Sequence, residues 1–286
     1  MLEELRQRLR GLEKPAGLVD GPAALPLGAP AVDAVLGGGL MRGALHEIAA
    51  AGEAHLAAAT GFAVGVAALA APSPRTAGRG SHLLWIAEDM AALESGAPYG
   101  PGLDGFGLAP ERLVTVAVAQ RRDLLWAMEE ALRCRAVGAV IGEMRHGALD
   151  TVAVRRLSLA AADTGALALI LRAAPADDAS TAATRWIVQA SPSSFVIPGR
   201  GQSPRTRNPE TNSELTSGFR VRPFGPPRND EEKSGARFAV ELMRNRRGPR
   251  GQWILEWSDS DGHFTCAAHA QPVAQPPVHR PHRAVA

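Results

Sequence analysis

Residues 25–60 read LPLGAPAVDAVLGGGLMRGALHEIAAAGEAHLAAAT and contain the first helix, turn and strand that the sequence predicts. Apolar residues recur at helical spacing between residues 32 and 36, and the glycine triplet at 37–39 ends the helix that they predict. Residues 44–48 form a short apolar run, which favours a strand. A strand that leads through a loop into a helix is therefore expected after residue 44.

This order resembles the approach to the nucleotide site of RecA-type recombinases, whose phosphate loop has the form G-x-x-x-x-G-K-[ST]. Backbone N–H groups of such a loop bind phosphate, its lysine pairs with the phosphates and its hydroxyl holds magnesium. In this chain all four of these loop positions carry other residues. They are, in order, Ala50, His55, Leu56 and Ala57. Because no lysine lies between residues 14 and 233, we expect a degenerate nucleotide loop, no cofactor and no enzymatic activity.

From residue 57 onward, helical patterns and apolar strand patterns alternate along the chain. Helices are predicted at 57–71, 123–135 and 149–163, and strands at 82–87, 113–118, 137–141 and 167–171. Strands separated by helices of this length favour right-handed crossovers and a parallel sheet. We therefore predict an α/β fold with a RecA-like core at 25–197, in which a mostly parallel, twisted sheet is flanked by helices.

The C-terminal strands follow a different pattern. Residues 184–190, TRWIVQA, alternate between polar and apolar side chains and predict an antiparallel strand. Residues 238–243 and 253–257 predict an antiparallel hairpin, because a turn rich in glycine and arginine separates them. This hairpin lies in a segment, 237–268, that we expect to complete the core.

Four segments lie outside the predicted core. They are an amphipathic helix at 1–14, a linker at 15–24, a disordered insertion at 198–236 and a disordered tail at 269–286. The helix has a stripe of four leucines that includes Leu5 and Leu9. It either packs on its own domain or docks on a neighbouring subunit, and in the second case Leu5 and Leu9 bind a partner.

Composition narrows the class of protein. The formal net charge is only +2, so charge alone gives no argument for nucleic-acid binding. Cys134 and Cys266 lie far apart and form no metal pattern, so we expect no metal site and a reduced, cytoplasmic location. The N-terminus is charged throughout, and the apolar run at 56–71 is shorter than the ~20 residues of a membrane span. We therefore expect neither a signal peptide nor a contact with a membrane.

Two acids follow predicted strands. Glu88 follows the strand at 82–87 and matches the RecA residue that activates the attacking water. Glu143 follows the strand at 137–141 and matches the acid that holds magnesium in that family. The alternative interpretation of Glu88 is an exposed carboxylate at a strand end, which the missing lysine favours, and without a phosphate loop we interpret both acids as vestigial.

The C-terminal hairpin carries a second resemblance. Arg244, Arg246 and Gly248 match the K-x-R-x-G element by which the last hairpin of hexameric replicative helicases reaches a neighbouring nucleotide, with arginine in place of lysine. The same residues also fit a basic, solvated hairpin, and we predict that Arg244 and Arg246 bind a partner. Segments 144–150 and 173–183 match the DNA-binding loops of RecA but are poor in basic and aromatic residues. Filament-type DNA binding is therefore not expected.

The RecA-like entry, the lost phosphate loop, the short DNA loops and the terminal strand pair together resemble the ImuA family of damage-inducible mutagenesis proteins. The resemblance covers residues 20–195 and 237–265. It implies a non-catalytic accessory role in translesion synthesis during the SOS response. The implied partners are ImuB and an error-prone polymerase α-subunit, with RecA as a further partner and DNA reached only indirectly.

Two other functions stay open at this point. One is a divergent RecA-like ATPase in DNA recombination or repair, which nucleotide binding would distinguish. The other is a SulA-like inhibitor of cell division, which would be recognised by a partner such as FtsZ.

Overall fold

The computed structural model of the chain describes residues 24–71, 80–145, 147, 149–176, 180–191 and 235–267. The predicted helix at 1–14, with Leu5 and Leu9, and the predicted tail lie outside the described residues. So do the predicted linker and insertion, apart from residue 24 of the linker and residues 235 and 236 of the insertion.

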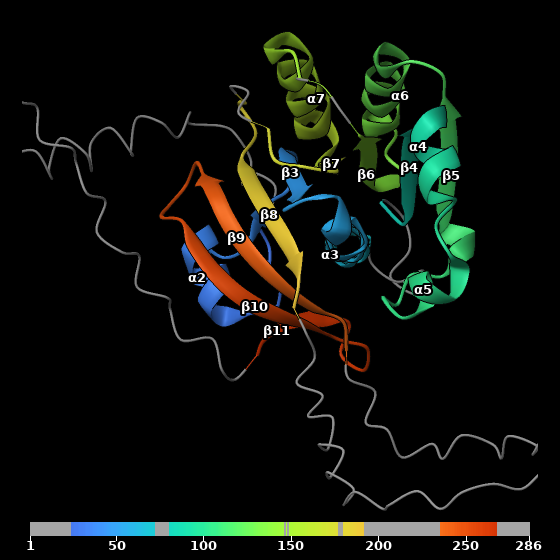
Figure 1. Cartoon of the computed structure of the whole chain (residues 1–286). Helices are drawn as coiled ribbons and strands as arrows, with labels where there is room; N and C mark the ends of the chain where they lie inside the picture. The colour runs from blue at the N-terminus through green and yellow to red at the C-terminus, as the bar shows by residue number, and fades with distance from the viewer. Residues whose placement is uncertain are drawn as a thin grey trace, which may run out of the picture. The chain divides into compact units, whose positions relative to one another are not determined.

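A nine-stranded sheet organises the described residues (Figure 1). Its strand order is β11-β10-β9-β8-β3-β7-β6-β4-β5. In chain order the strands are β3 (Leu45–Ala50), β4 (His82–Glu88), β5 (Leu113–Val118), β6 (Val137–Met144), β7 (Leu167–Arg172), β8 (Thr184–Ala190), β9 (Arg237–Asn245), β10 (Gly251–Ser258) and β11 (His263–Cys266). The pairs from β8 to β5 are parallel, and those from β8 to β11 are antiparallel. This confirms the predicted α/β fold with a mostly parallel sheet and a C-terminal antiparallel hairpin.

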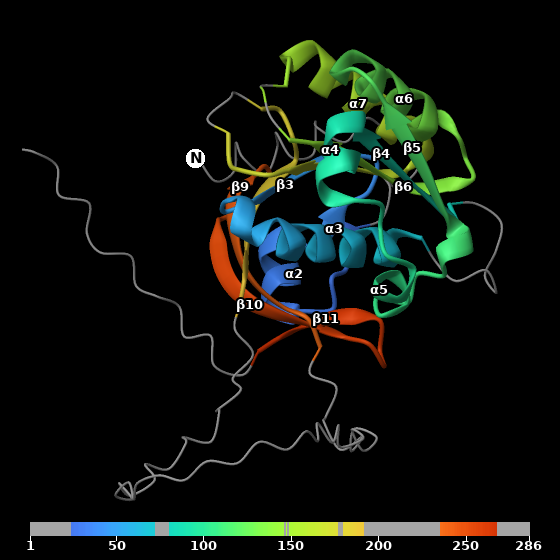
Figure 2. The ribbon, with the colours of Figure 1, turned by 45° about the vertical axis from the view of Figure 1, so that its right-hand side comes forward.

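Helices pack on both faces of this sheet. The helices are α2 (Pro30–Leu36), α3 (Leu56–Ala70), α4 (Asp89–Ser95), α5 (Gly100–Asp104), α6 (Arg121–Arg133) and α7 (Thr151–Thr164), with a small separate sheet of β1 (Ala24–Leu25) and β2 (Leu40–Met41). One hydrophobic cluster joins α3 to the sheet and includes Phe62, Trp186 and Phe264. A second cluster lies under α6 and α7 and includes Met128 and Leu157. Figure 2 shows that the antiparallel strands curve around α3 and partly enclose this helix.

The strand β8 corrects one prediction. Its alternating sequence predicts an antiparallel strand, but β8 is parallel to β3 on one side and antiparallel to β9 on the other. The alternation instead reflects burial, since Thr184, Trp186 and Val188 are buried and the residues between them are partly exposed. A period of two reports which face is covered and carries no information on the direction of the neighbouring strand.

Several boundaries also differ from the predictions. The strand β6 runs on to Met144, so Glu143 lies inside a strand and not after it. The short elements α4, α5 and β11 are not predicted, because they have too few residues to show a period. The strand β5 has the bounds predicted from its sequence.

The helix α3 is apolar along its whole length. The stretch Glu53–Ala70 is long and apolar enough to cross a membrane by composition alone. In the structure, however, Phe62, Ala63, Val66 and Ala67 of this stretch are at most 1% exposed inside the core. Burial between the parallel and the antiparallel parts of the sheet therefore accounts for the apolar sequence, as predicted for a buried helix.

Candidate functional site

The loop in which the sequence predicts a degenerate phosphate loop lies between β3 and α3. A single turn of 3-10 helix, η1 (Glu53–His55), precedes α3. The N–H of Ala51 donates to the carbonyl of Val188 at 3.0 Å, and the Nδ1 atom of His55 accepts from the N–H of Ala190 at 3.3 Å. Both contacts tie the loop to the end of β8.

The four residues at the loop positions offer little to a phosphate. Ala50 is buried in the core, and Leu56 packs against that core. Ala57 is exposed at the start of α3 but has no hydroxyl, and the Nδ1 atom of His55 is used within the chain. The four residues therefore supply neither the ammonium group nor the hydroxyl group that a phosphate loop uses.

This arrangement gives a direct prediction for nucleotide binding. We expect the purified chain to show no measurable heat of ATP binding by calorimetry and no phosphate release, because no side chain at Leu56 or Ala57 can pair with phosphate or magnesium. The contrary result would be micromolar affinity, or a turnover that the Glu88→Gln substitution abolishes.

The two acids interpreted as vestigial point to opposite faces of the sheet. Glu143 pairs in register with Ala87, so Glu88 turns to the other face. Glu88 lies 3.4 Å from the Nε atom of Arg121, measured from its Oε1 atom. Glu143 is 6% exposed and accepts a hydrogen bond from the Nε1 atom of Trp85 at 3.1 Å. The structure therefore does not bring the two carboxylates together.

Burial shapes the ionisation of Glu143. Desolvation raises the pKa of its carboxyl above the ordinary value, and the Trp85 hydrogen bond and the charge of Arg145 partly offset that rise.

Within the described part of the chain, no three His, Cys, Asp or Glu side chains are grouped so that they could hold a metal ion.

A buried carboxylate that sequence analysis missed lies at the centre of the sheet. Glu47 of β3 is 2% exposed, and its Oε2 atom lies 3.0 Å from the Nε atom of Arg185 on the neighbouring strand β8. Its Oε1 atom accepts a hydrogen bond from the hydroxyl of Ser180. The signal was present in the sequence, because a glutamate inside an apolar strand must find a partner when it is buried.

This carboxylate holds the segment that follows β7. Ser180 bonds to Glu47, and Arg185 also donates to the carbonyl of Ala176 at 2.7 Å. Arg244 of β9 donates to the carbonyl of Ser180. The described parts of the segment 173–183, which the sequence predicts to match a DNA-binding loop of RecA, are thus fixed to the sheet by three side chains.

The two arginines predicted to bind a partner have different surroundings. Arg244 is half-buried and bonded to Ser180, whereas Arg246 is exposed on the turn after β9. Asn245 fixes this turn, since its Nδ2 atom donates to the carbonyls of Val35 at 2.9 Å and Pro249 at 3.1 Å. Arg244 therefore has an intramolecular contact, and Arg246 has its side chain open to solvent.

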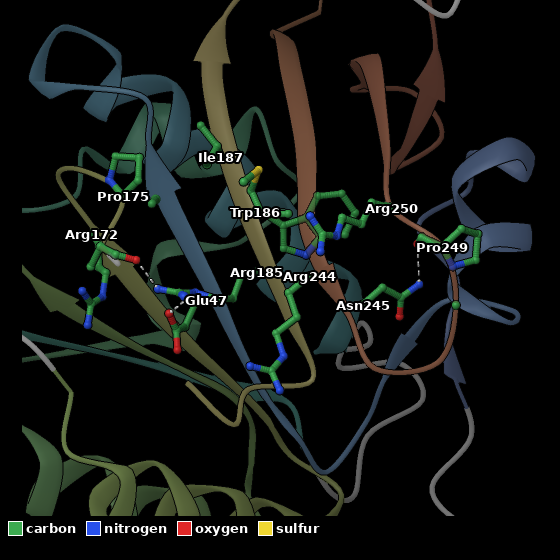
Figure 3. Close-up of a pocket in the computed structure, with 14 residues that line it drawn as sticks. Glu47, Arg172, Pro175, Arg185, Trp186, Ile187, Arg244, Asn245, Pro249 and Arg250 are labelled. Carbon is green, nitrogen blue, oxygen red and sulfur yellow. Dashed lines mark hydrogen bonds and ion pairs between the residues drawn. The ribbon is translucent and has the colours of Figure 1, made fainter. Parts of the chain in front are cut away.

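A cavity of about 800 Å³ opens beside these residues (Figure 3). It is lined by Glu47, Ala49, Arg172, Pro175, Ala176, Arg185, Trp186, Ile187, Met243, Arg244, Asn245, Gly248, Pro249 and Arg250. Figure 3 shows the side chain of Arg185 reaching from β8 across to Glu47. The cavity thus joins the central buried ion pair to the C-terminal hairpin.

Fold and site together define a class: an α/β protein on a mostly parallel sheet, in which the loop after β3 lacks the lysine and hydroxyl of a phosphate loop and an arginine-lined cavity adjoins the C-terminal hairpin. Comparison with protein-family models gives no match. The chain is similar to Protein ImuA of Caulobacter vibrioides, from strains NA1000 / CB15N and ATCC 19089 / CIP 103742 / CB 15. In both comparisons 31% of 243 residues are identical, over 84% of this chain and 85% of the relative. The chain belongs to the ImuA family.

Proposed function

We propose that the chain is an accessory subunit of the ImuA/ImuB damage-inducible mutagenesis system and acts in translesion synthesis during the SOS response. Membership of the ImuA family is the observation that carries this proposal. The proposed partners are ImuB and an error-prone polymerase α-subunit in the cytoplasm, with RecA as a further partner and DNA reached through them.

We further propose that this role needs no catalysis and that the core descends from a RecA-like ATPase. The position of the loop between β3 and α3 supports the descent, and the residues at its four key positions support the loss of activity. The ion pair of Glu88 and the buried hydrogen bond of Glu143 support structural roles for these acids in place of catalytic ones.

Protein contact is the activity that the surface supports. Arg246 and Arg247 are exposed on the hairpin turn, and arginine is enriched at protein interfaces because its planar guanidinium forms paired hydrogen bonds and stacks well. Leu5 and Leu9, in the predicted N-terminal helix, stay a second predicted contact for a partner.

A genetic experiment with a matched control tests this function. Deleting the gene should lower damage-induced mutation frequency, and the wild-type chain should restore it. The Glu88→Gln chain should restore it equally, because the proposed role does not use Glu88 as a catalytic base. Affinity-tagged wild-type chain from damage-treated cells should recover ImuB.

Two results would contradict the proposal. Loss of complementation by Glu88→Gln, with normal protein levels, would favour an ATPase. Recovery of FtsZ in place of ImuB, together with filamentous growth on overexpression, would favour an inhibitor of cell division.

A further inference from the structure

The cavity beside β9 carries an excess of positive charge. Four arginines and one glutamate line it, which gives a formal net charge of +3 among the described lining residues. Arg185 is paired with Glu47. Arg244 and Arg250 form no ion pair with a described residue, and Arg250 is exposed. These two guanidinium groups keep donors available for a ligand.

A β-bulge gives the cavity its mixed character. Arg185 pairs in register with Arg244 and Trp186 pairs with Leu242, so Met243 has no partner on β8. In a regular strand, consecutive side chains point to opposite faces, whereas a bulge redirects one of them. Met243 and Arg244 therefore both line the cavity, and Met243 is 40% exposed there.

The apolar part of the cavity continues from Met243. Ile187 of β8 and Pro249 of the turn also line it. No residue of β8 or β9 belongs to the cluster beneath α6 and α7, which draws its strand residues from β3, β4, β6 and β7. The cavity thus combines a partly apolar lining with two guanidinium groups, on the part of the sheet beyond these helices.

We propose that this cavity binds an acidic segment of a protein partner, with carboxylates on Arg244 and Arg250 and an apolar side chain against Met243 and Ile187. A guanidinium binds a carboxylate through two parallel hydrogen bonds, which fixes orientation as well as charge. A volume of about 800 Å³ lies within the usual range for binding cavities.

A nucleic acid fits this lining less well. Single-stranded nucleic acid needs aromatic surfaces on which bases stack, but the aromatic residue of the lining, Trp186, is 2% exposed. A peptide that carries both carboxylates and apolar side chains fits a lining of arginines, Met243, Ile187 and Pro249 better.

The inference rests on the proposed role as a protein-binding subunit, and peptide binding tests it without ImuB. The probe is a fluorescein-labelled peptide of alternating Asp and Leu, with a second peptide that carries Asn at each Asp position. Fluorescence anisotropy should show that the full-length chain binds the Asp peptide at least about tenfold more tightly. Equal binding of the two peptides would overturn the inference.

Variants with matched charge locate the site. Arg244→Gln with Arg250→Gln should weaken binding of the Asp peptide by about tenfold or more. Arg135→Gln with Arg155→Gln removes the same charge from exposed positions outside the cavity lining, and should change binding less than about twofold. An equal loss in both double variants would mean general surface charge and would overturn the inference.

Two further measurements exclude loss of folding and binding of nucleic acid as explanations. Because Arg244 also bonds to Ser180, the single exposed variant Arg250→Gln should by itself weaken binding measurably while leaving the melting temperature unchanged. An unlabelled oligo(dT) should fail to displace the Asp peptide, and displacement at peptide-like concentrations would assign the cavity to nucleic acid. The proposed function is tested by mutation frequency and by recovery of ImuB, whereas the cavity is tested by peptide binding. A failure of one can therefore be told apart from a failure of the other.

Discussion

The Glu47→Ala substitution is expected to lower the free energy of unfolding by about 3–5 kcal/mol, because it breaks a buried ion pair by removing one partner. The side chain of Glu47 is 3% exposed and that of Arg185 is 20% exposed, with 3.0 Å between Oε2 and Nε. Without the carboxylate, the guanidinium of Arg185 keeps its charge in a mostly buried position, and the hydroxyl of Ser180 loses its acceptor. Urea unfolding followed by tryptophan fluorescence measures the loss.

The chain offers a matched control for this effect. Arg237 and Glu256 form an ion pair at 2.9 Å between Nε and Oε2, with both side chains about a quarter exposed at 26% and 24%. Because both of these side chains keep more contact with water than Glu47 does, Glu256→Ala should cost less than Glu47→Ala, by about 2 kcal/mol or more. A Glu47→Ala variant that loses as little as the Glu256→Ala control would show that Arg185 moves out to solvent when its partner is removed.

The position of this ion pair links stability to the proposed binding site. Glu47 and Arg185 are register partners on β3 and β8, and Arg185 and Arg244 are register partners on β8 and β9. The three charged side chains therefore form a row across the sheet, and all three line the cavity. A change at Glu47 should disturb the wall of the cavity as well as the stability of the sheet.

Local sequence period predicted most of the fold for a physical reason. The strand β7, which is buried along its whole length, and the helix α3 consist largely of apolar residues, and burial of such a run needs no knowledge of distant residues. The direction of β8 could not be predicted, since alternation records which face is covered and the partner strands are chosen by the whole sheet.

The candidate site was less accessible to sequence analysis. Glu47 and Ser180 are 133 positions apart in the chain, so their contact leaves no local pattern. The bulge at Met243 could not be predicted either, because nothing in the sequence ELMRNRRG indicates which residue lacks a register partner on the neighbouring strand. Sequence did identify Arg244, although its contact with Ser180 is visible only in the structure.

A second buried side chain next to this row makes stability depend on pH. His46 is 0% exposed; its Nδ1 atom lies 2.7 Å from the hydroxyl of Thr184, and its Nε2 atom lies 2.9 Å from the carbonyl of Met41. Trp186 donates from Nε1 to the same Thr184 hydroxyl at 2.8 Å. A neutral ring satisfies every group, with Nε2–H donating to Met41 and Nδ1 accepting from Thr184.

Burial lowers the pKa of His46 from 6.5 to about 4, with a further lowering by the charge of Arg247 and an opposing effect of the Met41 carbonyl. As the pH falls, His46 therefore takes up a proton near pH 6.5 in the unfolded chain but only near pH 4 in the folded chain. Stability from this group is complete above pH 6.5 and is lost as the pH falls through this window, by about 3 kcal/mol in total.

Urea unfolding of the wild type and of His46→Gln at several pH values between 7 and 4 tests this assignment. The wild type should lose about 3 kcal/mol more than the variant across the window, because glutamine has no proton to gain. Carboxyl groups, including Glu143 with its pKa raised by burial, act in both proteins and cancel in the difference. The exposed His82 provides the control, since His82→Gln should leave the wild-type dependence unchanged. Parallel curves for the wild type and His46→Gln would mean that His46 is protonated in the folded chain, and the hydrogen-bond network of Met41, Thr184 and Trp186 would then have to be assigned differently.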